Sequence, residues 1–242
     1  IADWNGFPAR RAEAAARGRL RGLGLGHYVE SSIGSPRERA EIAVTPVGIV
    51  TVVIGTQPSG QGHETSFAQV ISDRLGVPVS AVNIVMGDTD IVSLGGGSHS
   101  GRSMRHAGTV MSMAADDLWA KAKRLAALAF DCAEAAVEIR DQRLTTPGTN
   151  RSLDLLQLAR EIGQIDLPEE LADGLAITRD NEMHEPVFPN GCAVCELEID
   201  PETGGIELVR YAAVDDVGRC INPMIVHGQT HGGIAQGVGQ AM

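Results

Sequence analysis

The sequence predicts an α+β fold in which mixed sheets pack against long helices. Short runs rich in β-branched residues, such as Ile49–Ile54, are bounded by turn residues and predict strands. Apolar residues recur at helical spacing over long stretches, above all over 104–130. The strands occur in groups with long helices between them, which favours separate layers of sheet and helix.

The first half of the chain contains two predicted helices and four predicted strands. The first helix is alanine-rich and spans 8–22, with Pro8 in the first turn, where an N–H has no intrahelical partner. The second helix spans 62–75 and ends before the segment 76–78, which contains glycine and proline. The predicted strands are 24–30, 40–45, 49–54 and 81–86, with a turn at 46–48.

The second half begins with a long helix, about 104–130, whose core candidates include Val110 and Leu118. Weak alternation over 131–151 predicts a small hairpin, and a short helix follows. Thr203-Gly-Gly205 predicts a hairpin turn. The remaining elements are the short helix at 152–162, strands at 176–178, 192–199 and 206–214, and a final helix at 223–242 that begins at Asn222-Pro223.

Composition excludes several classes of partner. The chain has 242 residues, 43% apolar content and a formal net charge of −11, so nucleic acid or an anionic membrane is not expected as the main partner. Four scattered cysteines do not resemble a disulfide framework and favour a reducing cytoplasm. No apolar run of about 18 residues and no signal peptide is present, which predicts a soluble protein.

The two ends of the sequence suggest a piece of a longer polypeptide. The chain starts at Ile1 rather than Met and stops at Met242 inside a helical pattern that has no terminating signal. Within it, a division into the sub-domains 1–130 plus 205–242 and 131–204 is compatible with the order of the elements.

A glycine-rich segment, 55–65, lies between a predicted strand and a predicted helix. Glycines let a backbone approach a ligand closely, and free N–H groups at a helix start attract anions. Gln61, His63 and Thr65 add neutral polar groups. The segment lacks the Gly-Lys-Ser/Thr ending of a P-loop and the spacing of a dinucleotide fingerprint. It is interpreted as an anion-binding turn, and the alternative is a turn that serves chain geometry alone.

A second glycine-rich loop, 95–103, has the same character. It precedes a helix and contains Ser98, Ser100 and Ser103 together with one cation, Arg102. Two such loops flanking the strand 81–86 could form the two walls of one anion pocket. The alternative is that both are ordinary surface turns.

The last helix is rich in glycine, and each glycine costs about 1 kcal/mol relative to alanine. Gln229, Gly233, Gln236 and Gln240 share one face, which would suit a polar ligand. The alternative for the glycines is close packing against a neighbouring helix.

Three other constellations favour structural roles. His227 and His231 have a zinc-compatible spacing, but no third ligand is indicated. The Cys192-x-x-Cys195 pair lies in a predicted strand, where residues three apart face opposite sides. Asp215-Asp216 at a strand end is interpreted as a turn or ion-pair element rather than a catalytic pair.

Several longer motifs carry a family resemblance. Gly55-Thr-Gln-Pro-Ser-Gly-Gln-Gly-His-Glu-Thr65, followed by Gly87-Asp-Thr-Asp90, resembles the molybdopterin-binding region of xanthine oxidase family large subunits. The similarity is greatest to carbon monoxide dehydrogenase-like and bacterial aldehyde oxidase-like members. Further matches occur in the same order along nearly the whole chain: the segment 3–11, Gly101-Arg-Ser103, Phe188-Pro-Asn-Gly-Cys192, 214–223 and 228–237.

The resemblance implies a cofactor site. The expected cofactor is molybdenum on molybdopterin cytosine dinucleotide, held without direct protein ligation of the metal. The matching positions imply cofactor contacts from Gly60, Gln61, Gly62, His63, Gly101, Arg102, Ser103 and Gln236.

The resemblance also implies an activity and partners. The family oxidises an aldehyde, an N-heterocycle or carbon monoxide with oxygen derived from water. The iron–sulfur and FAD groups sit on partner subunits or domains, and the rest of the large subunit completes the site. The catalytic glutamate of the family lies in a downstream Gly-Val-Gly-Glu type motif that is absent here, so the chain is expected to lack the cofactor and to be inactive alone. The alternatives are a non-catalytic interaction domain with a decayed site and a zinc hydrolase that uses His227 and His231.

Overall fold

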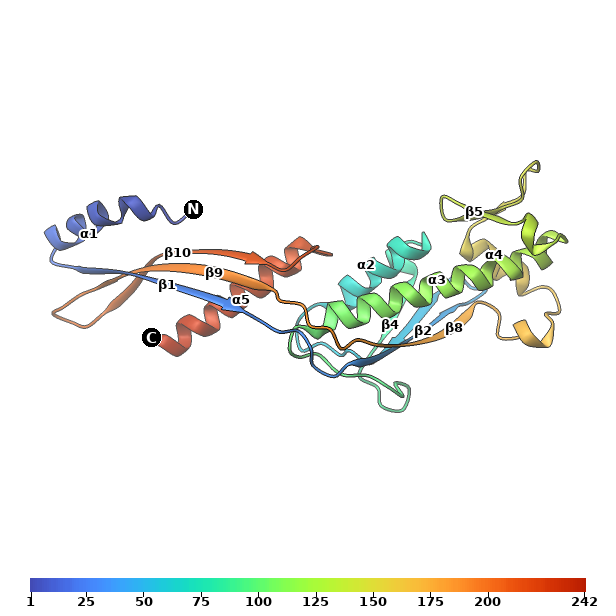
Figure 1. The fold of residues 1–242 in the computed structure, drawn as a ribbon, viewed down its shortest axis with the longest axis horizontal. Coiled ribbons are helices and arrows are strands. Elements are labelled where there is room, and N and C mark those ends of the chain that lie inside the picture. Colours follow the sequence, from blue (N-terminus) through green and yellow to red (C-terminus); the bar gives the residue numbers. More distant parts are fainter. The chain divides into compact units, whose positions relative to one another are not determined.

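The computed structural model describes all residues 1–242 and divides into two compact units (Figure 1). The first unit combines Ile1–Ser32 with Pro186–Met242, and the second unit is Ile33–Glu185. These boundaries differ from the division into 1–130 plus 205–242 and 131–204. The difference arises because the strand at Asn190–Ile199 pairs with strands near both ends of the chain.

The first unit is built on a three-stranded antiparallel sheet of order β1-β9-β10. Its strands are β1 (Leu20–Val29), β9 (Asn190–Ile199) and β10 (Ile206–Asp216). The hairpin turn before β10 is confirmed, with Gly204 at a φ of +72°. The unit also contains the 3₁₀ turn η1 (Trp4–Gly6) and the helices α1 (Phe7–Ala16) and α5 (Pro223–Ala241).

The first helix is shorter than the sequence predicts. A helix over 8–22 is wrong beyond Ala16, because Gly18 takes a φ of +75° and residues from Leu20 onward pair with β9. Strand pairing over ten positions therefore overrides the helical preference of this segment.

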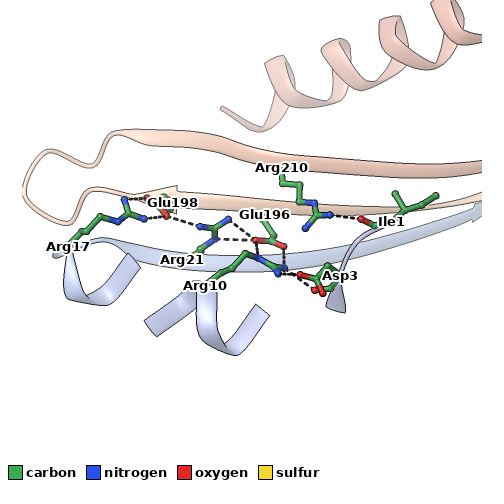
Figure 2. Close-up of polar contacts among 8 residues, drawn as sticks. All are labelled: Ile1, Asp3, Arg10, Arg17, Arg21, Glu196, Glu198 and Arg210. Atoms are coloured by element: carbon green, nitrogen blue, oxygen red, sulfur yellow. Dashed lines mark hydrogen bonds and ion pairs between the residues drawn. The ribbon is translucent and has the colours of Figure 1, made fainter. Parts of the chain in front are cut away.

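A cluster of arginines and glutamates joins α1 to the sheet (Figure 2). Glu196 and Glu198 on β9 are buried, with 1% and 4% of their surface exposed. Arg21 on β1 binds Glu196 at 2.9 Å and Glu198 at 3.1 Å. Arg10 of α1 also binds Glu196, and Arg17 at the end of α1 lies 2.7 Å from Glu198. The two carboxylates are thus neutralised by cations from both neighbouring elements.

The second unit contains a four-stranded sheet of order β4-β3-β2-β8. Strand β3 (Val50–Ile54) is parallel to β4 (Val82–Val85) and antiparallel to β2 (Arg37–Val44), and β8 (Ala176–Glu182) pairs with β2. Helices α2 (His63–Leu75) and α3 (Arg102–Phe130) pack side by side against this sheet (Figure 1).

The core of the second unit follows from alternation in the strands and helical spacing in α2 and α3. Alternate residues of β2 and β3 are buried and meet apolar side chains of both helices. The contributors with almost no exposure include Ile42, Val52, Ile54, Phe67, Ile71, Val110, Met111 and Leu118. This packing places the start of α2 and the start of α3 at defined positions relative to β2.

The rest of the second unit is a small three-stranded sheet with one short helix. The predicted hairpin is confirmed as β5 (Glu138–Arg140) and β6 (Arg143–Thr145), to which β7 (Ser152–Leu153) adds a strand. Helix α4 (Leu155–Ile162) begins after Asp154, which forms a capping box with Gln157. Three 3₁₀ turns complete the unit: η2 (Val79–Ala81), η3 (Glu134–Ala136) and η4 (Glu169–Leu171).

The α+β class is confirmed, with three sheets, one of them mixed, and five α-helices. None of these helices is both long and apolar enough to cross a membrane.

Candidate functional site

The two glycine-rich loops of the second unit meet through their backbones. A Cβ placed on Gly55 would lie 2.1 Å from the Cα of Gly95, and one placed on Gly95 would lie 2.2 Å from the Cα of Gly55. No side chain fits between the loops at this point. The expectation that they stand together is therefore met, and the anion pocket between them stays a prediction.

Glu38 of β2 binds both loops with one carboxylate. Its Oε1 accepts from the backbone N–H of Gly55 at 3.1 Å. Its Oε2 accepts from the hydroxyl of Thr56 at 2.7 Å and from the N–H of Gly96 at 3.3 Å. The side chain is 1% exposed, so these bonds lie away from water. Glu38 is the hub that fixes one loop against the other.

Arg102, the first residue of α3, completes this hub and is fully buried. Its guanidinium lies 2.9 Å from the carboxylate of Glu38. A guanidinium carries five N–H donors, and each of those of Arg102 has a protein acceptor. The other acceptors are the carbonyl oxygens of Ser35, Arg37 and Gly97 and the hydroxyl of Thr56. The side chain of Arg102 thus has no N–H left for an external anion, and its hydrogen bonds hold the surrounding segments together.

The other residues of the second loop are largely engaged within it. Gly101 precedes α3 with a φ of +63° and is exposed. The hydroxyl of Ser103 lies 2.6 Å from that of Ser98. The Nε2 of His99 lies 3.0 Å from the carbonyl oxygen of Gly96. This loop is therefore held by its own hydrogen bonds, and its backbone is exposed at Gly101.

The start of α2 combines an uncapped helix end with an exposed glycine. Gly62 precedes the helix at a φ of +70°, and no side chain caps the first N–H groups. Gly60 is exposed at a φ of +103°, and a Cβ there would meet nothing within 4 Å. Gln61 accepts from the backbone N–H of Ser59. The N–H groups of Thr65 and Ser66 donate to the carbonyl oxygen of Gly62, which leaves those of His63 and Glu64 as donors beside the open glycine. Such donors can bind a phosphate or another anion.

His63 contributes a buried polar atom without a partner. Its ring is 6% exposed and stacks on Phe67, with 4.7 Å between the ring centroids. Burial lowers the pKa of His63 below its ordinary value of 6.5, so the ring is neutral at pH 7. The Nδ1 atom has no hydrogen-bond partner within the protein. A buried orphan at the first position of α2 supports a ligand at this end of the helix.

Gln236 belongs to the other compact unit. It lies on α5 and is exposed, as are most residues of that helix. The second unit therefore contains Gly60, Gln61, Gly62, His63, Gly101, Arg102 and Ser103, whereas Gln236 lies in the first unit.

The other residues singled out in the sequence lie on the exposed face of α5, in β9 or in a turn. His227 and His231 are exposed, and no group of three or more metal-ligating residues occurs anywhere in residues 1–242. Cys192 and Cys195 are free thiols, and both lie in β9 as predicted. Asp216 accepts from the N–H of Gly218 in a turn, at 3.0 Å.

Sequence reasoning missed Glu38. The signal was present, because Glu38 shares the buried phase of β2 with Ala40, Ile42 and Val44. A carboxylate in phase with a core stripe needs a buried partner, and Arg102 is that partner.

Comparison with known proteins gives a consistent result. The family model described as "Molybdopterin cofactor-binding domain" matches residues 1–242. The carbon monoxide dehydrogenase large chain of Hydrogenophaga pseudoflava is 31% identical over all of this chain and 32% of its own length. The nicotine 6-hydroxylase large subunit of Paenarthrobacter nicotinovorans is 29% identical with the same coverage. The chain thus spans about a third of the length of the curated relatives it matches.

Solved structures agree with this match. The quinoline 2-oxidoreductase of Pseudomonas putida 86 superposes with a TM-score of 0.83 and 32% identity, over 98% of this chain and 32% of that one. The Cu,Mo-CO dehydrogenase in its carbon monoxide reduced state gives a TM-score of 0.81 and 31% identity, over 95% of this chain and 31% of that one. The chain belongs to the molybdopterin cofactor-binding domains of the carbon monoxide dehydrogenase and xanthine dehydrogenase large-subunit family.

Proposed function

We propose that this chain is the cofactor-binding part of a molybdenum hydroxylase that oxidises an aldehyde, an N-heterocycle or carbon monoxide. The observation that carries the proposal is the uncapped start of α2, where Gly60 is open and His63 Nδ1 lacks a partner. The bound molybdenum cofactor would supply the redox chemistry by which oxygen derived from water is added to the substrate.

The chain's own residues would bind and orient that cofactor. The first N–H groups of α2, with Gly60, Gln61 and Gly62, would hold anionic or oxo groups through neutral donors. The Nδ1 atom of His63 would form a hydrogen bond with the cofactor. Gly101 and Ser103 would provide further contacts from the second loop. Arg102 would act through Glu38 by fixing the two loops. Gln236 of α5 is assigned as a further cofactor contact.

The same proposal includes the rest of the assembly. We assign molybdopterin cytosine dinucleotide as the cofactor form, with iron–sulfur and FAD groups on partner subunits. We expect the complete complex to be cytoplasmic and this chain alone to lack activity, because the general base of the family is supplied by a motif not found in these residues.

Elemental analysis for molybdenum tests the proposal. It is measured on this chain and on the full-length gene product expressed with its neighbouring genes. We expect molybdenum in the complete complex, a large loss in the Gln61→Ala variant, and retention in the matched Gln164→Ala variant, since Gln164 is exposed after α4. Absence of molybdenum from the complete complex would overturn the proposal and favour the non-catalytic interaction domain.

A further inference from the structure

Three residues from three strands of the first unit form one row across the sheet. Gly191 of β9 pairs with Tyr28 of β1 on one side and with Asp215 of β10 on the other. Asp215 belongs to the segment 214–223 and Gly191 to the segment 188–192, two of the motifs noted in the sequence. The cofactor contacts proposed above use neither residue.

The side chains of Tyr28 and Asp215 meet over the central glycine. The hydroxyl of Tyr28 donates to Oδ1 of Asp215 at 3.0 Å. A Cβ on Gly191 would lie 2.3 Å from that same Oδ1 and 2.6 Å from Cε1 of Tyr28. Any side chain at Gly191 would therefore push the two residues apart, so glycine is required for their contact.

The second oxygen of Asp215 reaches α5. The hydroxyl of Thr230 donates to Oδ2 of Asp215 at 3.3 Å. Helix α5 has no buried residue, so apolar packing does little to fix its position on the sheet. A hydrogen bond to a charged acceptor is accordingly an important tie between this helix and the sheet.

The Tyr28 phenol is protonated at neutral pH and can donate to Asp215. Partial burial raises the pKa of Tyr28, whose surface is still 47% exposed, and the hydrogen bond to the Asp215 carboxylate raises this pKa further. The phenol therefore stays a donor across the neutral pH range. Asp215 is the charged group that acts on the Tyr28 phenol.

We propose that Asp215 is a positioning residue that sets the place of α5 on the sheet. The hydroxyl of Tyr28 orients the carboxylate of Asp215, and the absence of a side chain at Gly191 leaves room for this contact. The hydrogen bond from Thr230 to the same carboxylate then fixes α5. Gln236 follows Thr230 by less than two turns of α5, at about 3.6 residues per turn. The role of this row in cofactor binding rests on the proposed function, whereas its effect on α5 does not.

Hydrogen exchange of the α5 amides in the complete chain tests the positioning role. We expect Asp215→Ala and Thr230→Val each to speed exchange in α5 by about tenfold, the loss of a charged hydrogen bond. Asp216→Ala is the matched control, because Asp216 accepts from a turn N–H instead. Unchanged exchange in Asp215→Ala would overturn the proposal, and Thr230→Val keeps the test valid if Asp215→Ala fails to fold.

Titration of Tyr28 gives a second measurement, which a general increase in the mobility of α5 would not change. The chain has two tyrosines, so the Tyr28 ring carbon signal can be assigned by its loss in Tyr28→Phe. We expect its pKa to fall in Asp215→Ala and to stay unchanged in Thr230→Val. A Tyr28 pKa unaffected by Asp215→Ala would overturn the role assigned to the row. Molybdenum content of the complete complex tests the proposed function separately, because α5 exchange and Tyr28 titration need no cofactor.

Discussion

The carboxylate of Glu38 and the guanidinium of Arg102 lie 2.9 Å apart, and both side chains are almost completely buried. The pair joins β2 to the first residue of α3 and holds both glycine-rich loops through backbone N–H groups. Burying a charge pair offers little net stability, whereas removing one partner leaves an uncompensated charge. The main effect of this pair is therefore to hold the two glycine-rich loops in position.

Glu38→Ala should destabilise the chain strongly. It leaves the Arg102 charge buried and unpaired, which we expect to lower the free energy of unfolding by about 3–5 kcal/mol. Urea unfolding measures the change, and Glu41→Ala is the matched control because Glu41 lies on the opposite face of β2. Equal losses in the two variants would contradict the hub role of Glu38.

Gly55→Ala should force the two glycine-rich loops apart. The new Cβ would meet the Cα of Gly95 at 2.1 Å, and backbone cannot yield as a flexible side chain can. We expect a loss of about 1–3 kcal/mol in the free energy of unfolding, as for an overpacked site. Gly108→Ala on α3 serves as control, since its Cβ would meet only Met104 Sδ at 3.4 Å and alanine favours the helix. A Gly55→Ala variant as stable as the control would contradict the close contact.

The first unit should lose stability in acid through Glu196 and Glu198. Hydrogen bonds from Arg10 and Arg21 lower the pKa of Glu196, and one from Arg17 lowers the pKa of Glu198, both from an ordinary value of 4.5. Because the folded-state pKa values are the lower ones, the stabilisation is present above pH 4.5 and is lost as pH falls through the folded values. Thermal unfolding followed over this range should show the loss. The Glu196→Gln variant should show a smaller dependence on pH, and an unaltered dependence would contradict the assignment.

His63 should titrate below the ordinary histidine value. Its pKa is lowered chiefly by burial, so protonation opposes the folded state. The unfolded chain then binds the proton more readily, and this contribution to stability is present above pH 6.5 and is lost as pH falls below it. Nuclear magnetic resonance of the imidazole signals measures the value. A His63 pKa at or above 6.5 would contradict the buried, neutral ring.

Much of the second unit could be predicted from local sequence patterns. The predicted helix 62–75 and strand 49–54 agree with the structure to within one residue, because apolar periodicity and glycine turns are local signals. The proximity of the two glycine-rich loops also followed from their positions around one strand.

What escaped prediction depends on contacts between distant residues. Glu38 and Arg102 are joined only in the folded sheet, so Arg102 looked like a free cation in its loop. The segment after Ala16 looked helical because its partner strand, β9, lies far along the chain. For the same reason, the division into compact units could not be read from the order of the elements.

The division into units also constrains the order of folding. The second unit is inserted between two strands of the first unit, and Ser32 N–H donates to the carbonyl oxygen of Val187 at 3.1 Å where the flanking segments rejoin. Strand β1 must therefore wait during synthesis until the whole insert and then β9 have been made. The insert can complete its own core earlier, which shortens the loop that closing the sheet must bridge. A nascent chain whose residues up to 185 have left the ribosome would therefore carry a finished second unit and an unpaired β1.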